Sequence, residues 1–190
     1  WSGLAPVAIT FGYTNNHNGY DERQFETTNE NVLYIKADAM TSEVVSFHAN
    51  YEYGSRSGSG FDPEQLEQIA EQPDLRYYDL ANRDRNRFTG LVDVMPTEAL
   101  TLSVSAGFGS DDFNDSYFGL QNSDFSTVSF GFDYTLPRGV NVGASYNYER
   151  YTGTQRSRSA SPGQTPPQET DPRRDWIADS KETVHYYSFY

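Results

Sequence analysis

The chain has 190 residues, a mean hydropathy of −0.75 and no cysteine, which excludes a disulfide-stapled fold, a thiolate metal site and a cysteine nucleophile. Its formal net charge of −13 argues against a nucleic-acid-binding protein, because such proteins present a basic face to the phosphates. Only 36% of the residues are apolar, yet 15% are aromatic, which disfavours disorder and suits a protein whose apolar residues form a thin outer band.

Alternation of apolar and polar residues predicts eight β-strands, because successive side chains of a strand point to opposite faces. The run from Leu100 to Phe108 is typical, with apolar residues separated by threonine, serine and glycine. Each strand therefore has one apolar face and one small, polar face. In chain order the expected strands span residues 5–15, 30–40, 43–54, 86–95, 98–109, 124–135, 139–151 and 182–190.

Tight turns and long connections alternate strictly along the chain. The turns MTSE, MPTE and LPRG follow the second, fourth and sixth strands. Such an order is typical of an up-and-down barrel with turns at one rim and loops at the other, and a Greek-key sandwich gives no reason for it. The long connections are expected near residues 15–30, 55–85, 110–123 and 152–181.

The expected strands have about 10–12 residues, close to the length with which a tilted strand crosses a bilayer. We therefore predict an all-β, transmembrane, antiparallel up-and-down β-barrel over residues 1–190, located in the bacterial outer membrane. Both ends of the sequence read as strand, so we expect a processed or partial chain.

Aromatic residues gather where the strands meet the long loops, which predicts a belt at the level of the lipid headgroups. Tyrosine and phenylalanine also favour strands in general, but that preference does not explain their gathering at one end. The predicted belt consists of Phe11, Tyr13, Tyr51, Tyr53, Phe108, Tyr146 and Tyr148.

The opposite face of the strands is expected to line a hydrated lumen. Its charges could pair across a narrow eight-stranded barrel or line a wide channel, and the many small residues would underfill the narrow one. We therefore favour the wider barrel. The predicted lumen-facing residues are Lys36, Asp38, His48, Glu52, Arg87, Asp93, Asp133 and Glu149.

Two loops have their own patterns. Asp62 and Pro63 predict the start of a short helix over Gln65–Gln72, with Leu66 and Ile69 as its apolar face. The cluster Arg83, Asp84, Arg85 and Arg87 reads as a rim of internal salt bridges or as a contact for a partner.

The last long loop is rich in serine, proline and glycine, and its end, Asp171–Trp176, is expected to pack back on the rim. A second loop contains closely spaced oxygen ligands that are candidates for calcium, although the spacing lacks the glycine and terminal glutamate of the helix-loop-helix motif. These candidates are Asp111, Asp112, Asn114 and Asp115.

No catalytic constellation is evident, so we expect no enzyme activity. His17 lies in a polar loop, His48 falls on the predicted lumen face, and His185 lies in a strand without a nucleophile beside it. No glycine-rich loop leads from a strand into a helix, so nucleotide binding has no support either.

Four segments over roughly residues 76–190 are distinctive: YDLANRDR, SDDFNDSYFGLQNSD, YERYTGTQRSR and DPRRDW. In these segments the chain resembles the MtrB/PioB family of outer-membrane barrels that are associated with decahaem cytochromes. Members of that family are large barrels that sheath a multihaem cytochrome. The resemblance implies that this chain is part of a barrel wall, acting as a conduit or sheath for electron transfer across the outer membrane. It implies two partners, membrane lipid and a multihaem c-type cytochrome in the lumen, and no cofactor bound directly, since the chain has no CxxCH motif.

Two other interpretations stay open at this point. A general diffusion porin, or a small structural barrel, would have the same architecture. A soluble secreted β-sandwich or adhesin domain would also contain alternating strands.

Overall fold

The computed structural model describes residues 7–190, so the first two residues of the expected strand 5–15 lie outside the described part. Three short helical segments lie in the loops: α1 (Glu64–Gln68), η1 (Pro166–Gln168) and η2 (Pro172–Arg174). The strands are β1 (Val7–Gly19), β2 (Thr27–Ser42), β3 (Val45–Ser59), β4 (Leu75–Arg76), β5 (Arg83–Thr97), β6 (Leu100–Asp112), β7 (Phe118–Leu136), β8 (Val140–Arg158) and β9 (Asp175–Phe189).

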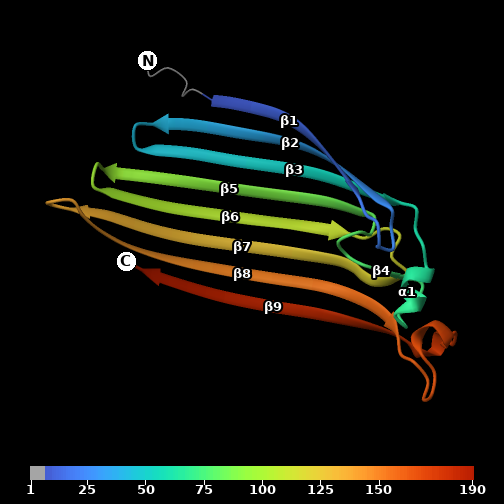
Figure 1. Ribbon diagram of the computed structural model, residues 1–190. Coiled ribbons are helices and arrows are strands. Elements are labelled where there is room, and N and C mark those ends of the chain that lie inside the picture. Colours follow the sequence, from blue (N-terminus) through green and yellow to red (C-terminus); the bar gives the residue numbers. More distant parts are fainter. Residues whose placement is uncertain (1–6) are drawn as a thin grey trace.

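The long strands form one layer in the order β1-β2-β3-β5-β6-β7-β8-β9, and every neighbouring pair is antiparallel. Figure 1 shows an open, gently curved sheet with the tight turns at one end, the long connections at the other, and β1 and β9 at opposite margins. The predicted up-and-down architecture is confirmed. Over the described residues the sheet is not covered by a second one, as a β-sandwich would require.

The strands are longer than expected at their loop ends. Strand β7 begins at Phe118, and β8 continues to Arg158, so the long connections shrink to residues 20–26, 60–82, 113–117 and 159–174. Polar residues that read as loop in the sequence are paired across neighbouring strands here, for example Arg85 with Asp111. The last tight turn lies where it was predicted, at LPRG, and uses two left-handed residues, Arg138 and Gly139. The first two turns lie later than the predicted MTSE and MPTE, at residues 43–44 and 98–99, because β2 and β5 continue to Ser42 and Thr97.

The register places most apolar side chains of the long strands on the same face, while a few, such as Val32, Leu91 and Val184, lie on the other. Val104 of β6, for example, lies opposite Val92 of β5 and Phe130 of β7. Many of these side chains are exposed, with Phe11 at 75% and Phe189 at 80%. An apolar surface that crosses eight strands is far larger than a monomer in water tolerates, so it requires another apolar environment.

The apolar face has the height of a bilayer core. In β6 it runs from Leu100 to Phe108, which is roughly 27 Å along the strand and about 21 Å across a membrane if the strand is tilted by about 40°, near the apolar band of about 25 Å in outer-membrane barrels. Strand β8 continues for ten residues beyond Tyr148. The loop end of the sheet therefore stands well beyond the apolar band.

A small buried core lies at the loop end. It consists of residues from the connections and from adjoining strand ends: Phe25, Leu66, Leu80, Ala81, Phe113 and Phe118. The connection before β2 folds over the polar face of β3, since a Cβ on Gly58 would lie 2.6 Å from the Phe25 ring.

Helix α1 is shorter than the predicted Gln65–Gln72. It ends at Gln68 because Ala70 adopts a left-handed conformation, with φ of 60°. Leu66 is buried as expected, but Ile69 is 62% exposed, so the predicted apolar pair is wrong for Ile69. Asp62 accepts a hydrogen bond from the backbone N–H of Glu64 at 2.9 Å.

None of the helices formed by residues 7–190 has the length and apolar character needed to cross a membrane.

Candidate functional site

The polar face of the sheet holds the charged residues that the sequence singled out. The register places all eight on the face opposite Val104 and Phe130; that this face lines a lumen stays a prediction. They are Lys36, Asp38, His48, Glu52, Arg87, Asp93, Asp133 and Glu149.

This polar face is concave. A hollow of about 480 Å³ lies over β2, β3, β5, β6 and β7, with Lys36, Asp38 and His48 on one side and Gly107 and Thr127 on the other. His48 Nδ1 lies 2.7 Å from Asp38 Oδ1, so these two side chains are hydrogen-bonded to each other. The charged residues are concentrated on β2, β3 and β5, whereas small residues form the polar face of β6 and much of that of β7.

Two aromatic rings on the polar face, those of Tyr34 and Phe125, lie against the sheet. A Cβ on Gly109 would lie 2.5 Å from the ring of Phe125, and one on Gly12 would overlap the ring of Tyr34. In each case a glycine in the neighbouring strand leaves the space that the ring fills. These two rings therefore take up little of the concave space.

The predicted aromatic belt follows the rows of paired residues only in part. Phe11, Tyr51 and Phe108 lie in one row of residues that are paired across successive strands, and this row reaches β8 at Arg150. Tyr148 and Tyr146 lie two and four residues nearer the turn end than Arg150. A row of paired residues is not level in a barrel whose strands are tilted, so a level belt must step along the strands. That these rings form a membrane belt stays a prediction.

An ion-pair network, the rim cluster, lies on the polar face at the loop end. Asp111 is its centre: it is 8% exposed and accepts hydrogen bonds from Arg85 at 2.8 and 2.9 Å. Arg83 and Arg87 lie 3.5 and 3.8 Å from the same carboxylate, and Arg83 also donates to Glu30. Arg56, opposite Arg83 on β3, completes the cluster.

Arg56 holds the connection 60–82 onto the polar face. Its guanidinium donates to the carbonyl oxygens of Ala81 at 2.9 Å, Asp79 at 2.8 Å and Tyr78 at 2.5 Å. Asn82 then bridges two elements, accepting from the backbone N–H of Gly58 at 2.7 Å and donating to Asp115. These contacts fix the end of the connection just before β5 begins.

The same connection reaches across β5 and β6 to a third strand. Its two-residue strand β4 pairs in parallel with the start of β7, Leu75 opposite Phe118 and Arg76 opposite Gly119. Gly119 has φ of 110°, and a Cβ there would lie 2.4 Å from the carbonyl oxygen of Arg76. Only glycine fits this approach, so β4 is a built part of the rim.

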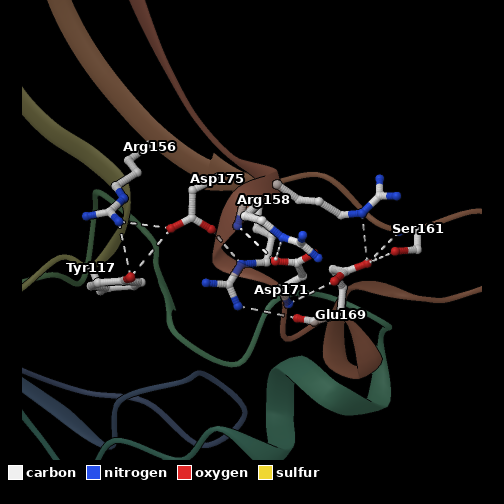
Figure 2. Close-up of polar contacts among 9 residues, drawn as sticks. Tyr117, Arg156, Arg158, Ser161, Glu169, Asp171 and Asp175 are labelled. Carbon is white, nitrogen blue, oxygen red and sulfur yellow. Dashed lines mark hydrogen bonds and ion pairs between the residues drawn. The ribbon is translucent and has the colours of Figure 1, made fainter.

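A second network, the hairpin cluster, fixes the connection between β8 and β9 (Figure 2). Asp175 accepts from Arg156 at 2.9 Å and from Arg158 at 2.6 Å, and Arg156 also donates to the Tyr117 hydroxyl at 3.1 Å. Glu169, 4% exposed, accepts from the backbone N–H groups of Ser161 and Asp171, at 2.8 and 2.9 Å. The segment thus packs back through Asp175, while Trp176 stays 39% exposed.

Asp171 offers a test of this loop in solution. Hydrogen bonds from the side chain and backbone N–H of Arg173 lower the pKa of Asp171 from 3.8 to about 2. Because the folded pKa is lowered, the contact stabilises the loop above about pH 4 and is lost as the pH falls through about 2. We expect Arg173→Gln to raise the pKa of Asp171 toward its usual value, measured by ¹³C carboxyl titration. An unchanged midpoint would show that Arg173 does not hold this carboxylate.

The candidate calcium ligands do not converge. Asp111 and Asp112 are successive strand residues and point to opposite faces, and Asp111 is already neutralised by arginines. Asn114 donates to Asp84 at 2.7 Å, and Asp115 accepts from Asn82. In the part of the chain that the structure describes, no group of three or more acidic, histidine or cysteine side chains could hold a metal ion.

The three histidines also lie apart. His17 is on β1 opposite Asn29, His48 pairs with Asp38, and His185 Nδ1 lies 2.9 Å from the Tyr146 hydroxyl. No serine or threonine hydroxyl makes a hydrogen bond with any of them between residues 7 and 190. The arrangement gives no support to nucleophilic catalysis.

The sequence did not single out Glu30 or Arg56, although both belong to the rim cluster. Arg83, Arg85 and Arg87 alternate with other residues at the spacing of one strand face, which was the available signal. The segments YDLANRDR and SDDFNDSYFGLQNSD contact each other through Arg85–Asp111, Asn82–Asp115 and Asp84–Asn114.

Comparison with known proteins gives two findings. The family described as "Putative outer membrane beta-barrel porin, MtrB/PioB" matches residues 5–189. "Outer membrane protein MtrB" of Shewanella baltica (strain OS185) is 30% identical over 132 residues, which is 68% of this chain and 19% of that protein. The matched part therefore spans about a fifth of this relative's length.

Proposed function

The chain belongs to the MtrB/PioB family of outer-membrane β-barrel porins, and from this premise we propose that its sheet is one sector of the wall of a wide barrel whose lumen sheathes a multihaem cytochrome. The bacterial outer membrane is its location. In this proposal the apolar face meets lipid and the concave polar face meets the lumen.

One observation carries the proposal: a single layer of eight long strands has one continuous apolar face and one concave polar face. Backbone groups inside a bilayer must all be hydrogen-bonded, which only closed β-structures achieve with strands. Such a wall separates lipid from an aqueous or protein-filled interior. Its contribution to electron transfer would be insulation and positioning, without chemistry of its own.

A wide barrel fits this sheet better than a small closed one. Over residues 7–190, β1 and β9 are not paired with each other, so each leaves one edge of the sheet open. Open edges are not viable in lipid, and we propose that further strands of the same barrel pair with them. Small residues such as Ser105, Gly107 and Ser129 would also leave an eight-stranded interior underfilled.

The electron carriers would belong to the partner. The chain has no cysteine for covalent haem attachment, and its three histidines lie on strands β1, β3 and β9 without forming a pair. The donor set does not fit a haem, so we propose that this chain binds no cofactor directly and is not an enzyme.

Purification from native membranes tests whether a multihaem cytochrome occupies the lumen. The protein is extracted in detergent and its mass and visible absorption are recorded. We expect a Soret band and a second polypeptide that carries the haem. A colourless, heat-modifiable barrel that conducts ions when reconstituted would contradict the sheath and support a diffusion porin.

Cysteine labelling tests the two faces, and the absence of cysteine from this chain makes single variants easy to read. Val104→Cys and Ser105→Cys are neighbours on β6 that point to opposite faces. With a membrane-impermeant thiol reagent, we expect Ser105→Cys to react only after the partner is removed, and Val104→Cys never to react. Reaction of Ser105→Cys in native membranes would indicate an open, water-filled lumen, and the reverse pattern would overturn the assignment of faces.

A further inference from the structure

The apolar face of β8 and β9 changes character in steps toward the loop end. On β8 it runs from Ala144 through Tyr146 and Tyr148 to Arg150. On β9 the paired positions run from Phe189 through Tyr187 and His185, and Lys181 follows after Thr183. The order from apolar residues to amphipathic rings to cations is the order of environments across a lipid–water interface.

The rings below the two cations form a packed group. The Tyr146 ring centroid lies 5.0 Å from that of Tyr187, and the Tyr148 centroid lies 5.3 Å from that of His185. The Tyr146 hydroxyl and His185 Nδ1 are 2.9 Å apart. This group marks the level at which the apolar band ends on these two strands.

Arg150 and Lys181 lie together just beyond this level. Arg150 is opposite Thr183, and Lys181 is opposite Thr152, so the two cations are diagonal neighbours on one face. Both are exposed, and across residues 7–190 neither has an acidic group within 4.0 Å. The arginines of the rim and hairpin clusters, in contrast, are held by carboxylates or carbonyl oxygens of this chain.

The surroundings leave room for a headgroup. A hollow of about 230 Å³ lies beside Arg150 and is also lined by Asp124, Ser126 and Thr152. Ser126 occupies the place on β7 that Phe108 holds on β6, so the row of large side chains is interrupted beside Arg150. On the same face of β9, Asp179 accepts a hydrogen bond from Thr154 at 2.8 Å, and Asp175 is held by Arg156 and Arg158.

We propose that Arg150 and Lys181 bind the phosphate group of a membrane lipid, whose acyl chains lie along the rings of Tyr146, Tyr148 and Tyr187. A guanidinium can hold two phosphate oxygens in its planar fork, and an ammonium adds a point charge to a third. The inference rests on the proposed assignment of the apolar face to lipid. It adds a defined lipid site to a wall that would otherwise contact lipid without selectivity.

Lipid retention measured by native mass spectrometry tests the proposal. The protein, purified in detergent with any partner it retains, is titrated with dioleoyl phosphatidylglycerol and with dioleoylglycerol, which has the same chains and no phosphate. We expect Arg150→Gln with Lys181→Gln to weaken phosphatidylglycerol binding about thirtyfold, from two contacts of about fivefold each. Binding of dioleoylglycerol is expected to stay unchanged.

Arg138→Gln is the matched control, because Arg138 is an exposed arginine without an ion pair in the described residues but lies at the turn end. An equal loss in this control, or no loss in the double variant, would overturn the proposal. Displacement of the lipid by inorganic phosphate at equal concentration would overturn the proposal as well. It would show that the site binds a free anion as tightly as it binds the lipid. Labelling of Val104→Cys from water would instead refute the assignment of faces, and the lipid site with it.

Discussion

Asp111→Asn is expected to open the loop end of the sheet while the membrane-spanning part stays intact. Asp111 is buried and faces Arg83, Arg85 and Arg87, so the neutral amide leaves three guanidinium groups without their central anion. Removing one partner from a buried ion pair costs about 3–5 kcal/mol. In hydrogen-exchange measurements, the backbone amides of β5 and β6 on the loop side of the paired residues Phe88 and Phe108 should exchange faster. A protease should also cut the connection 60–82.

Asp112→Asn is the control for this result. Asp112 is the next residue on β6, is exposed and points to the opposite face. The substitution removes the same charge from the chain without disturbing the arginines. Equal effects of the two variants would indicate a general response to charge and would contradict a specific role of Asp111.

Val104→Arg is expected to prevent stable membrane assembly. Val104 lies at the middle of the apolar run on β6, between Val92 and Phe130 on the neighbouring strands. An arginine on the lipid face at the bilayer midplane costs about 2–4 kcal/mol. The variant should show a smaller folded, heat-modifiable fraction and a lower urea midpoint after refolding into lipid vesicles.

Ser105→Arg tests the same strand from the other side. Its side chain lies on the concave face near Gly107 and Thr127, where a long polar side chain can reach water or a neighbouring charge. We expect its folded fraction to stay close to that of the parent. If Ser105→Arg is the variant that fails to assemble, the two faces have been assigned the wrong way round.

The architecture was predictable because it depends on local physics. Alternation of side chains along a strand fixes the face of each residue, so Val104 and Ser105 could be assigned to opposite faces from the sequence alone. The turn at Pro137 was predictable for a similar reason, since proline does not fit the interior of a ladder. Pro96 instead lies inside β5, where the pairing with β6 is irregular between Val94 and Thr97, and the turn follows at residues 98–99. Neither inference requires knowledge of distant partners.

The loop end was harder to predict because its contacts join residues far apart in the chain. Arg83 meets Glu30 across 53 positions, and Arg85 meets Asp111 across 26. The sequence shows such residues as charged and polar, which is typical of loops, and does not show that each has a partner. The predicted strands therefore stopped short, and the calcium candidates included an aspartate that arginines already neutralise.

The parallel pairing of β4 with β7 has a mechanical consequence. A wall that is one sheet thick bends easily, because neighbouring strands can rotate about their shared edge without breaking their hydrogen bonds. The connection 60–82 is hydrogen-bonded to β3 through Arg56 and to β7 through Leu75 and Arg76. It therefore crosses β5 and β6 and holds β3 and β7 at a fixed distance. The loop end of the wall therefore resists bending between β3 and β7. The turn end of the same strands has no such connection across them and is expected to bend more easily.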